Sequence, residues 1–256
     1  RLKKFLSHFY NQTSYIIDRK IRRDEEEFDI NPFNDNDENE LALNLSFRNS
    51  IFFNRGKQHY TTSYSYISSK NKNLLSTGLQ ENIQQSHQLN FNHKFEESWL
   101  ITLKNELNDT ESISENFQNR NYRIDGILIN PKLSYLLNRQ TRFDVFYQFN
   151  EQENNLGDKE LLNQQKFGTG FSFANKQQFA MSGEFNYILN DFEGNAFSPV
   201  AYQILEGLQP GKNLTWSLLL QKKLTAYLDL NLSYQGRKSE DVSAIHTGNV
   251  QLKAYF

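Results

Sequence analysis

The sequence predicts an all-β protein: an antiparallel up-and-down transmembrane β-barrel of about twelve strands. Two observations carry this prediction. Apolar and polar residues alternate over stretches of about eight to twelve residues, which gives each strand one apolar and one polar face. The connections between these stretches alternate between long polar loops and tight turns. Such barrels have longer loops on one side and short turns on the other, whereas a soluble sandwich has no reason to sort loops by side.

Most of the expected strands show the alternation. In the segment 40–53, for example, Leu45 and Phe47 share one face, while Ser46 and Arg48 share the other. Near two strand ends, Trp99 and Trp216 fit an aromatic girdle at a membrane interface. The expected strands are 13–21, 40–53, 59–66, 86–95, 99–107, 121–135, 143–149, 166–173, 179–189, 214–224, 228–237 and 249–256.

One segment breaks the alternation. In 121–135, Tyr122 and Ile124 fall on one parity, and Leu133 and Tyr135 fall on the other. One extra residue in a strand reverses its faces, and proline cannot donate a hydrogen bond to a neighbouring strand. The sequence therefore predicts a β-bulge at 127–131, around Pro131.

The connections assign the two sides of the barrel. Because they alternate in length, all long loops lie on one side, and both chain ends lie on the other. Long external loops are expected at 22–40, 68–81, 108–120, 150–163, 190–213 and 237–245. Tight turns are expected at Arg55, Glu96, Asn138, Asn175 and Thr225.

Composition excludes several classes of protein. The chain has 256 residues, 14% aromatic residues, no cysteine and a net charge of −2. No apolar run reaches the roughly 18 residues of a membrane-spanning helix. Without a basic stripe to neutralise phosphates, nucleic acid is not an expected partner. The absence of cysteine excludes disulfides and thiolate metal sites.

The polar rows should line the lumen, because a charge that faces lipid at mid-depth costs about 2–4 kcal/mol. Both signs of charge occur on these rows. The residues expected to line the lumen are Arg48, Lys104, Glu106, Asp144, Glu184, Asp229 and Lys253.

The segment 198–209 predicts a short helical insert in an external loop. Ser198 is a helix N-cap, Pro199 suits the first helical position, and Pro210 follows the end. The insert is either a plug or partner-docking element at the mouth, or a helix that only caps its loop. Its docking residues are expected to be Val200, Ile204 and Leu208.

Sites for chemistry are weakly indicated. Asp35, Asp37 and Glu38 could bind Ca²⁺, but their spacing departs from the EF-hand order, and a solvated loop is favoured. The five histidines are scattered. No metal site, cofactor or catalytic residue is therefore expected, and an outer-membrane hydrolase is a minor alternative.

The final stretch "VQLKAYF" has alternating apolar residues and a terminal aromatic. It resembles the C-terminal signature of bacterial outer-membrane β-barrels, which implies that Phe256 is an insertion signal read by the barrel-insertion machinery. Together with "LEGLQPGKNLTW" and "GRKSE…IHTGNVQLKAYF", it resembles the C-terminal barrel of large outer-membrane proteins of Bacteroidota. The resemblance implies an outer-membrane location, with both chain ends in the periplasm.

The expected role is a membrane anchor or scaffold, or a subunit of a multi-component cell-envelope complex. The expected partners are lipid, lipopolysaccharide and other envelope proteins. The alternative is a porin or transporter that passes solute or polypeptide. The chain begins at Arg1, and its first ten residues lack the features of a signal peptide, so we expect residues 1–256 to be the C-terminal part of a longer chain.

Overall fold

Segments of alternating polarity form paired strands, because each strand can present one apolar face while its backbone bonds to both neighbours. The computed structural model describes residues 7–22, 40–56, 59–175, 178–240 and 242–255. This part of the chain has twelve strands, a 3-10 helix η2 and a short helix α2. Their bounds are β1 Phe9–Ile21, β2 Glu40–Phe53, β3 Tyr60–Leu75, β4 Gly78–Phe95, β5 Trp99–Ser114, η2 Gln118–Arg120, β6 Tyr122–Leu136, β7 Thr141–Asn154, β8 Leu161–Asn175, β9 Phe179–Glu193, α2 Pro199–Ile204, β10 Gly211–Thr225, β11 Leu228–Ser239 and β12 Ile245–Ala254.

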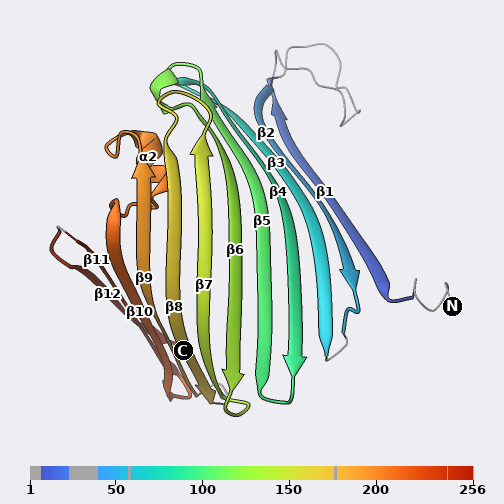
Figure 1. Ribbon diagram of the computed structural model, residues 1–256, viewed down its shortest axis with the longest axis vertical. Coiled ribbons are helices and arrows are strands. Elements are labelled where there is room, and N and C mark those ends of the chain that lie inside the picture. Colours follow the sequence, from blue (N-terminus) through green and yellow to red (C-terminus); the bar gives the residue numbers. More distant parts are fainter. Residues whose placement is uncertain (1–6, 23–39, 57–58, 176–177, 241, 256) are drawn as a thin grey trace.

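The strands form one sheet in which every strand lies next to its neighbours in sequence, from β1 to β12 (Figure 1). All eleven pairs are antiparallel. The predicted all-β, up-and-down topology is confirmed. None of the helices in the described part of the chain is both long and apolar enough to cross a bilayer.

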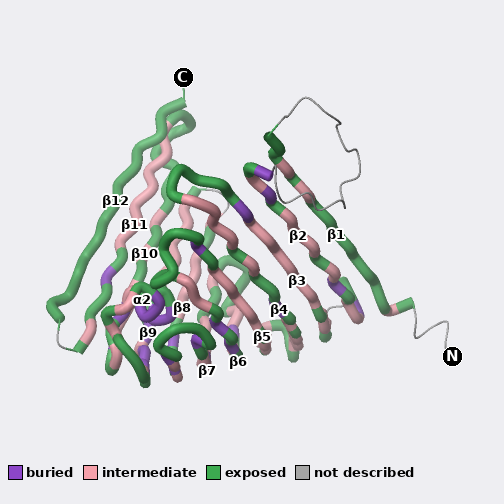
Figure 2. The backbone as a smooth tube through the Cα atoms, turned by 90° about the horizontal axis from the view of Figure 1, so that it is seen from above, coloured by how far each residue is buried: buried purple, intermediate pink, exposed green. Residues whose placement is uncertain are grey.

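The sheet curves into a wall with a concave and a convex side (Figure 2). β1 and β12 stand at the two ends of this wall, and an opening separates them. Among the described residues, β1 pairs only with β2, and β12 pairs only with β11. The sheet in this structure is therefore curved like a barrel wall and open along one side.

The two ends of the wall carry different connections. We call the end that carries α2 the loop end and the opposite end the turn end. At the turn end, β4 stops at Phe95 and β5 starts at Trp99, and the other turns lie where the sequence predicts them. β1 begins and β12 ends at the turn end (Figure 1). The connection 194–210 between β9 and β10 is the longest described one at the loop end, and we call it the insert.

One predicted loop is wrong. The segment 68–81 is not a long loop, because β3 continues to Leu75 and β4 starts at Gly78. Lys70 lies on β3 and forms an ion pair of 3.0 Å with Glu81 on β4. The polar residues that suggest a loop belong to the loop-end parts of β3 and β4, which extend beyond the apolar region of the sheet.

The predicted bulge in β6 is also wrong. β6 pairs with β5 without a register shift from Tyr122 to Tyr135. Ile124 is buried against the insert, and Tyr122 packs against the same cluster. Both side chains point to the concave side, where they contact apolar residues. The change of parity therefore reflects a local apolar patch and not an extra residue.

Candidate functional site

The concave wall carries the charged residues that the sequence assigns to the lumen. Directly paired residues of neighbouring strands lie on the same face of a sheet. The pairing of residues from strand to strand places all of these residues on one face, which also holds Leu162 under the insert. The residues on this face are Arg48, Lys104, Glu106, Asp144, Glu184, Asp229 and Lys253.

The structure pairs several of them locally and does not gather them into one cluster. On β5, the Lys104 ammonium lies 2.8 Å from the Glu106 carboxylate. On β7, the Asp144 carboxylate lies 3.1 Å from the Arg142 guanidinium and accepts a hydrogen bond from Ser134 of β6. On β5 and β7 the two signs of charge therefore lie side by side and do not form a patch of one sign.

The remaining members of the set lie apart. Glu184 accepts a hydrogen bond of 2.8 Å from the amide of Asn186. Asp229 accepts a hydrogen bond from the hydroxyl of Tyr255, and this bond raises the pKa of Tyr255 above its ordinary value. Arg48 and Lys253 are exposed at opposite ends of the sheet order.

The insert lies on the concave side at the loop end (Figures 1 and 2). Its helix starts at Pro199, and the Ser198 hydroxyl accepts a hydrogen bond of 2.9 Å from the backbone amide of Ala201. The helix is shorter than the predicted 198–209, because Glu206 and Gly207 adopt left-handed backbone conformations with φ of 54° and 72°. Glycine adopts this conformation without strain, so the chain can turn back towards β10.

An apolar cluster holds the insert on the wall. Leu162 of β8 is fully buried, and Ile204 of α2 is 1% exposed. The cluster joins residues of α2 to residues of β6 and β8, with aromatic rings of β6 and β9 packed against it. Its members are Ile124, Leu162, Val200, Ala201, Ile204 and Leu205, together with Tyr122 and Phe192. Burial of such side chains typically contributes about 1.5–3 kcal/mol each.

A buried carboxylate fixes the start of the insert. Glu160 is 1% exposed. It accepts hydrogen bonds of 2.7 Å from the Ser198 hydroxyl and of 2.7 Å from the Asn154 amide. A buried carboxylate is tolerated where such donors replace water. The same Ser198 hydroxyl thus caps the helix and ties it to the loop between β7 and β8.

The end of the insert is tied to the neighbouring strands. The Arg237 guanidinium of β11 donates to the Gly207 carbonyl at 3.1 Å. The amide of Asn190 on β9 donates to the Gln209 carbonyl at 3.1 Å. Asn213 of β10, which is fully buried, donates to the same carbonyl at 2.8 Å. The insert is therefore held at both ends by polar contacts and in its middle by apolar ones.

The structure places the predicted docking residues Val200, Ile204 and Leu208 against the chain's own wall. All three are buried. They are therefore not displayed to a second protein in this arrangement. Sequence reasoning missed the wall residues that receive them, Leu162 and Ile124, and the buried Glu160. The parity change in β6 was a signal of this patch.

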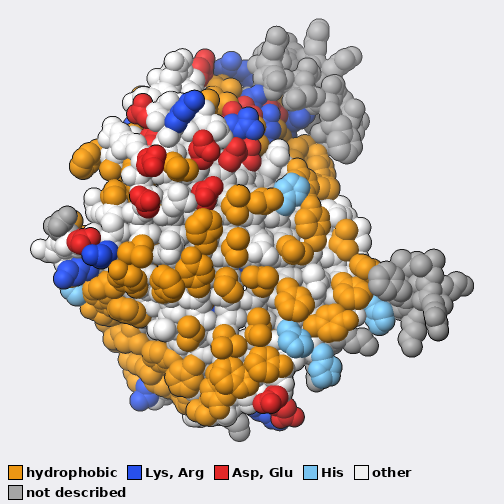
Figure 3. Space-filling model, viewed as in Figure 1, with side chains coloured by type: hydrophobic (Ala, Val, Ile, Leu, Met, Phe, Trp, Pro, Cys, Tyr) orange, Lys and Arg blue, Asp and Glu red, His pale blue; other side chains and the backbone are white. Residues whose placement is uncertain are grey.

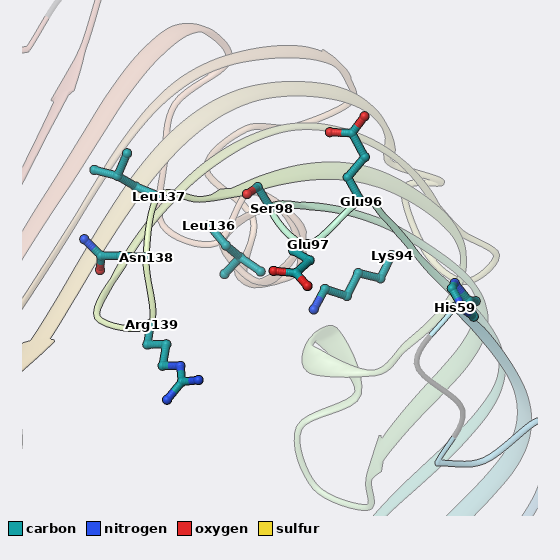
Figure 4. A pocket seen from close by; sticks show the side chains of 9 residues that line it. All are labelled: His59, Lys94, Glu96, Glu97, Ser98, Leu136, Leu137, Asn138 and Arg139. Atoms are coloured by element: carbon teal, nitrogen blue, oxygen red, sulfur yellow. The ribbon is translucent and has the colours of Figure 1, made fainter.

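Among the cavities on the concave side, two lie at opposite ends of the wall. One, of about 430 Å³, lies beside the insert and is lined by Lys166, Glu206 and Arg237 among others. The other, of about 730 Å³, lies at the turn end between the β4–β5 and β6–β7 turns (Figure 4). There Lys94 and Glu97 point towards one another, and Arg139 points away from them (Figure 4). Both cavities are lined by residues of the two signs of charge.

The convex wall has the opposite character. Apolar side chains form a broad band over it, and charged side chains gather towards the loop end (Figure 3). Val145 of β7 is 59% exposed on this face, and Phe167 and Phe185 are similarly exposed. Water-soluble monomers rarely expose apolar patches larger than a few hundred Å². The wall is thus polar inside and apolar outside.

Several polar atoms on the convex wall form hydrogen bonds with one another. The Tyr64 hydroxyl lies 2.7 Å from Nδ1 of His87, and the Tyr234 hydroxyl lies 2.8 Å from Nδ1 of His246. The Trp216 indole donates to the Tyr234 hydroxyl at 3.3 Å. At the turn end, the Trp99 ring packs on another aromatic ring, that of Tyr135, with centroids 4.7 Å apart. These rings suit an interface between lipid and water.

Two predicted sites lie outside the described residues. They are the weak metal candidates Asp35, Asp37 and Glu38, and the terminal Phe256. In the described ranges, no group of three or more histidine, aspartate or glutamate side chains is arranged to hold a metal ion.

Comparison with known proteins adds structural similarity at low identity. No protein-family model and no curated protein sequence matches the chain. The chain is similar to the NanC porin with a TM-score of 0.40 and 11% identity, over 82% of this chain and 94% of the porin. It is also similar to the monoaromatic hydrocarbon channel CymD with a TM-score of 0.45 and 10% identity, over 94% of this chain and 77% of the channel. Its similarity to the transport unit of the autotransporter AIDA-I from Escherichia coli has a TM-score of 0.40 and 14% identity, over 84% of each chain. The assignment of the fold rests on the strand order and register of the chain itself.

Proposed function

We propose that this chain is an outer-membrane β-barrel that serves as a membrane anchor or scaffold within a cell-envelope complex. The membrane location is supported by the apolar convex wall, where residues such as Val145 are more than half exposed. In water this surface would be unfavourable by about 25 cal/mol per Å². In lipid it is the surface that a transmembrane sheet needs, with the polar row turned inwards.

The docked insert is the single observation that favours a scaffold over an open pore. Its helix is packed onto the concave wall at the loop end, and Ala201 and Leu162 are fully buried there. Hydrogen bonds from Ser198 and Arg237 hold its two ends. An element docked in this way occupies part of the mouth, which reduces the passage available to solutes.

Single-channel recording in planar bilayers tests this role. We expect the purified protein to show no large, stable open current. A variant in which residues 195–209 are replaced by a short Gly-Ser linker should conduct more, because the mouth is then cleared. A large and stable current from the unmodified protein would refute the scaffold role.

The second candidate is a porin or transporter, and the lined cavities favour it. The cavity of about 730 Å³ at the turn end and the one of about 430 Å³ beside the insert both lie on the concave wall. Charged pairs such as Lys104 with Glu106 would then face the solute. This function predicts conductance in the unmodified protein, and a change in ion selectivity when Lys104 is replaced by glutamate.

The loop end is proposed to face the cell exterior, where lipopolysaccharide lies. Charged residues on the outer face near this end form pairs, such as Arg123 with Asp109 at 2.9 Å and Lys212 with Glu240 at 3.1 Å. Such a rim above an apolar band suits contact with a charged headgroup layer. The turn end and both chain ends would then lie in the periplasm, and Phe256 would act as the insertion signal. Surface proteolysis of intact cells at the insert tests this orientation.

A further inference from the structure

A third cavity lies at the loop end, between the concave wall and the insert. Its volume is about 200 Å³, and it is lined by residues of β4, β5, β6, η2 and the insert. Ser112 and Ser114 of β5 line it and share the concave face of Lys104, because residues an even number of positions apart in a strand point to the same side. Gln203 of α2 forms another side, so the cavity depends on the docked insert.

The lining is rich in groups that donate and accept hydrogen bonds. β4 contributes the side-chain amides of Gln80 and Asn82, which lie opposite Ser114 and Ser112 of β5 in the strand pairing. The insert adds a third amide, that of Gln203. Each amide carries two N–H donors and an acceptor oxygen, and each hydroxyl can both donate and accept. The described lining contains no carboxylate.

One polar group of this cavity lacks a partner. Ser114 is 8% exposed, and its buried hydroxyl forms no hydrogen bond with any described residue. The backbone amide of Ser114 donates to Oδ1 of Asn121 at 2.7 Å, which fixes the backbone at this position. At the start of the insert, by contrast, the buried Asn154 and Glu160 are paired with each other. A buried hydroxyl without a partner is unfavourable, so a ligand that supplies one would gain affinity there.

The other sides of the cavity are held by contacts of their own. Tyr122 lines the cavity and packs against the apolar cluster under the insert. The Arg120 guanidinium lies 5.0 Å from the centre of the Phe117 ring in a cation–π contact. Strands β4, β5 and β6 are each paired on both sides. The cavity is therefore preformed, and little ordering is required when a ligand enters.

These features select the chemistry of the ligand. A polyhydroxylated compound matches the lining, because its hydroxyls can pair with amides and hydroxyls while the apolar face of a sugar ring lies on Tyr122 or Pro199. An acidic ligand is disfavoured, because Arg120 is the only charged side chain of the described lining and is exposed. An extended peptide is disfavoured as well, because it would add to a free strand edge, and β4, β5 and β6 have none.

The size of the cavity limits the ligand to about one ring. Water occupies about 30 Å³ per molecule in the liquid, so the cavity has the volume of about seven waters. We propose that it binds one neutral sugar residue, with Asn82, Ser114 and Gln203 as hydrogen-bonding residues. Binding itself requires only the docked insert, whereas access from outside the cell rests on the proposed orientation of the loop end. Two sources present such a residue there, the glycan of lipopolysaccharide and free saccharides.

Saturation-transfer NMR on the purified full chain, in a detergent without a sugar headgroup, tests this site. The probes are glucose, galactose, mannose and N-acetylglucosamine, and the lipid-free oligosaccharide released from lipopolysaccharide. We expect at least one probe to bind with a Kd on the order of 1 mM. Binding of the free sugars or of the oligosaccharide supports the site and identifies the source. If no probe binds, the proposal is wrong.

Substitutions locate the bound sugar. Asn82 and Gln84 are both exposed on the same face of β4, and the described lining includes Asn82 but not Gln84. Asn82→Ala should weaken binding about two- to tenfold, the range for a lost hydrogen bond, and Gln84→Ala is the control that should leave it unchanged. Ser114→Ala should weaken binding by a similar factor and leave thermal stability unchanged, because its hydroxyl has no hydrogen bond to lose.

Other results would contradict the site. Binding that is equally strong in Asn82→Ala and Ser114→Ala would place the sugar elsewhere and overturn the proposal. Failure of the scaffold role is measured separately, as conductance in bilayers. A protein that conducts and still binds sugar through Ser114 would refute the scaffold role and leave this site in place.

Discussion

Truncation of Leu162 to alanine should release the insert from the wall. Leu162 is fully buried beneath α2, in the cluster that contains Ile204. Truncating a buried leucine costs about 2–5 kcal/mol, and each 1.4 kcal/mol is a factor of ten. The population of undocked insert should therefore rise by about 30- to 4,000-fold. Hydrogen exchange of the backbone amides of residues 198–208 measures this population directly.

The matched control is Leu219→Ala. Leu219 also lies on the concave face, because it pairs with Ser182 and Ser233, but it is 42% exposed. Its truncation should leave exchange in the insert unchanged. If Leu162→Ala left exchange in the insert at the level of the unmodified protein, the insert would not depend on this apolar cluster, and the account of its docking would be wrong.

Two further predictions concern single sites. An alanine at Gly168 would place its Cβ 2.1 Å from the ring of Phe146. Urea unfolding in liposomes should therefore show that Gly168→Ala lowers the free energy of unfolding by about 1–3 kcal/mol. Gly170→Ala is the control and should be nearly neutral, because the nearest atom to its Cβ would lie 3.6 Å away. The hydrogen bond from Lys212 holds the pKa of Glu240 below its ordinary value. The stabilisation from this pair is thus fully present above the ordinary glutamate pKa and is lost as the pH falls through the lowered pKa. Lys212→Gln should raise the pKa of Glu240, which NMR titration measures. An unchanged pKa would contradict the pairing.

The strand pattern was predictable because it is local. Residues such as Leu45 and Phe47 report their face through alternation alone, and the register follows once tight turns fix each hairpin. The same reasoning failed at 68–81, where charged residues suggested a loop. Lys70 and Glu81 instead extend two strands beyond the apolar band, and their pairing across strands is not visible in either segment alone.

The insert was predictable only as a helix. Ser198 and Pro199 mark its start and could be recognised, whereas its end at Ile204 could not, because the stop signal in the sequence is Pro210. Its partners could not, because Leu162 and Glu160 precede it by more than thirty residues and meet it only through the curvature of the sheet. The change of parity at Ile124 suggested a bulge for the same reason. Alternation of polarity shows that the environment of a strand face changes, but it does not show what causes the change.

Site-directed spin labelling of two consecutive residues in the middle of β10 tests the central claim most directly. Leu218 pairs with Gly183 and Tyr234 on the convex row, and Ser217 pairs with Glu184 on the concave row. In liposomes, a nitroxide at Leu218→Cys should be relaxed mainly by oxygen, which concentrates in lipid, and one at Ser217→Cys mainly by a water-soluble nickel chelate. The reverse pattern, with position 218 in water and position 217 shielded from it, would contradict a wall that turns its apolar row towards lipid.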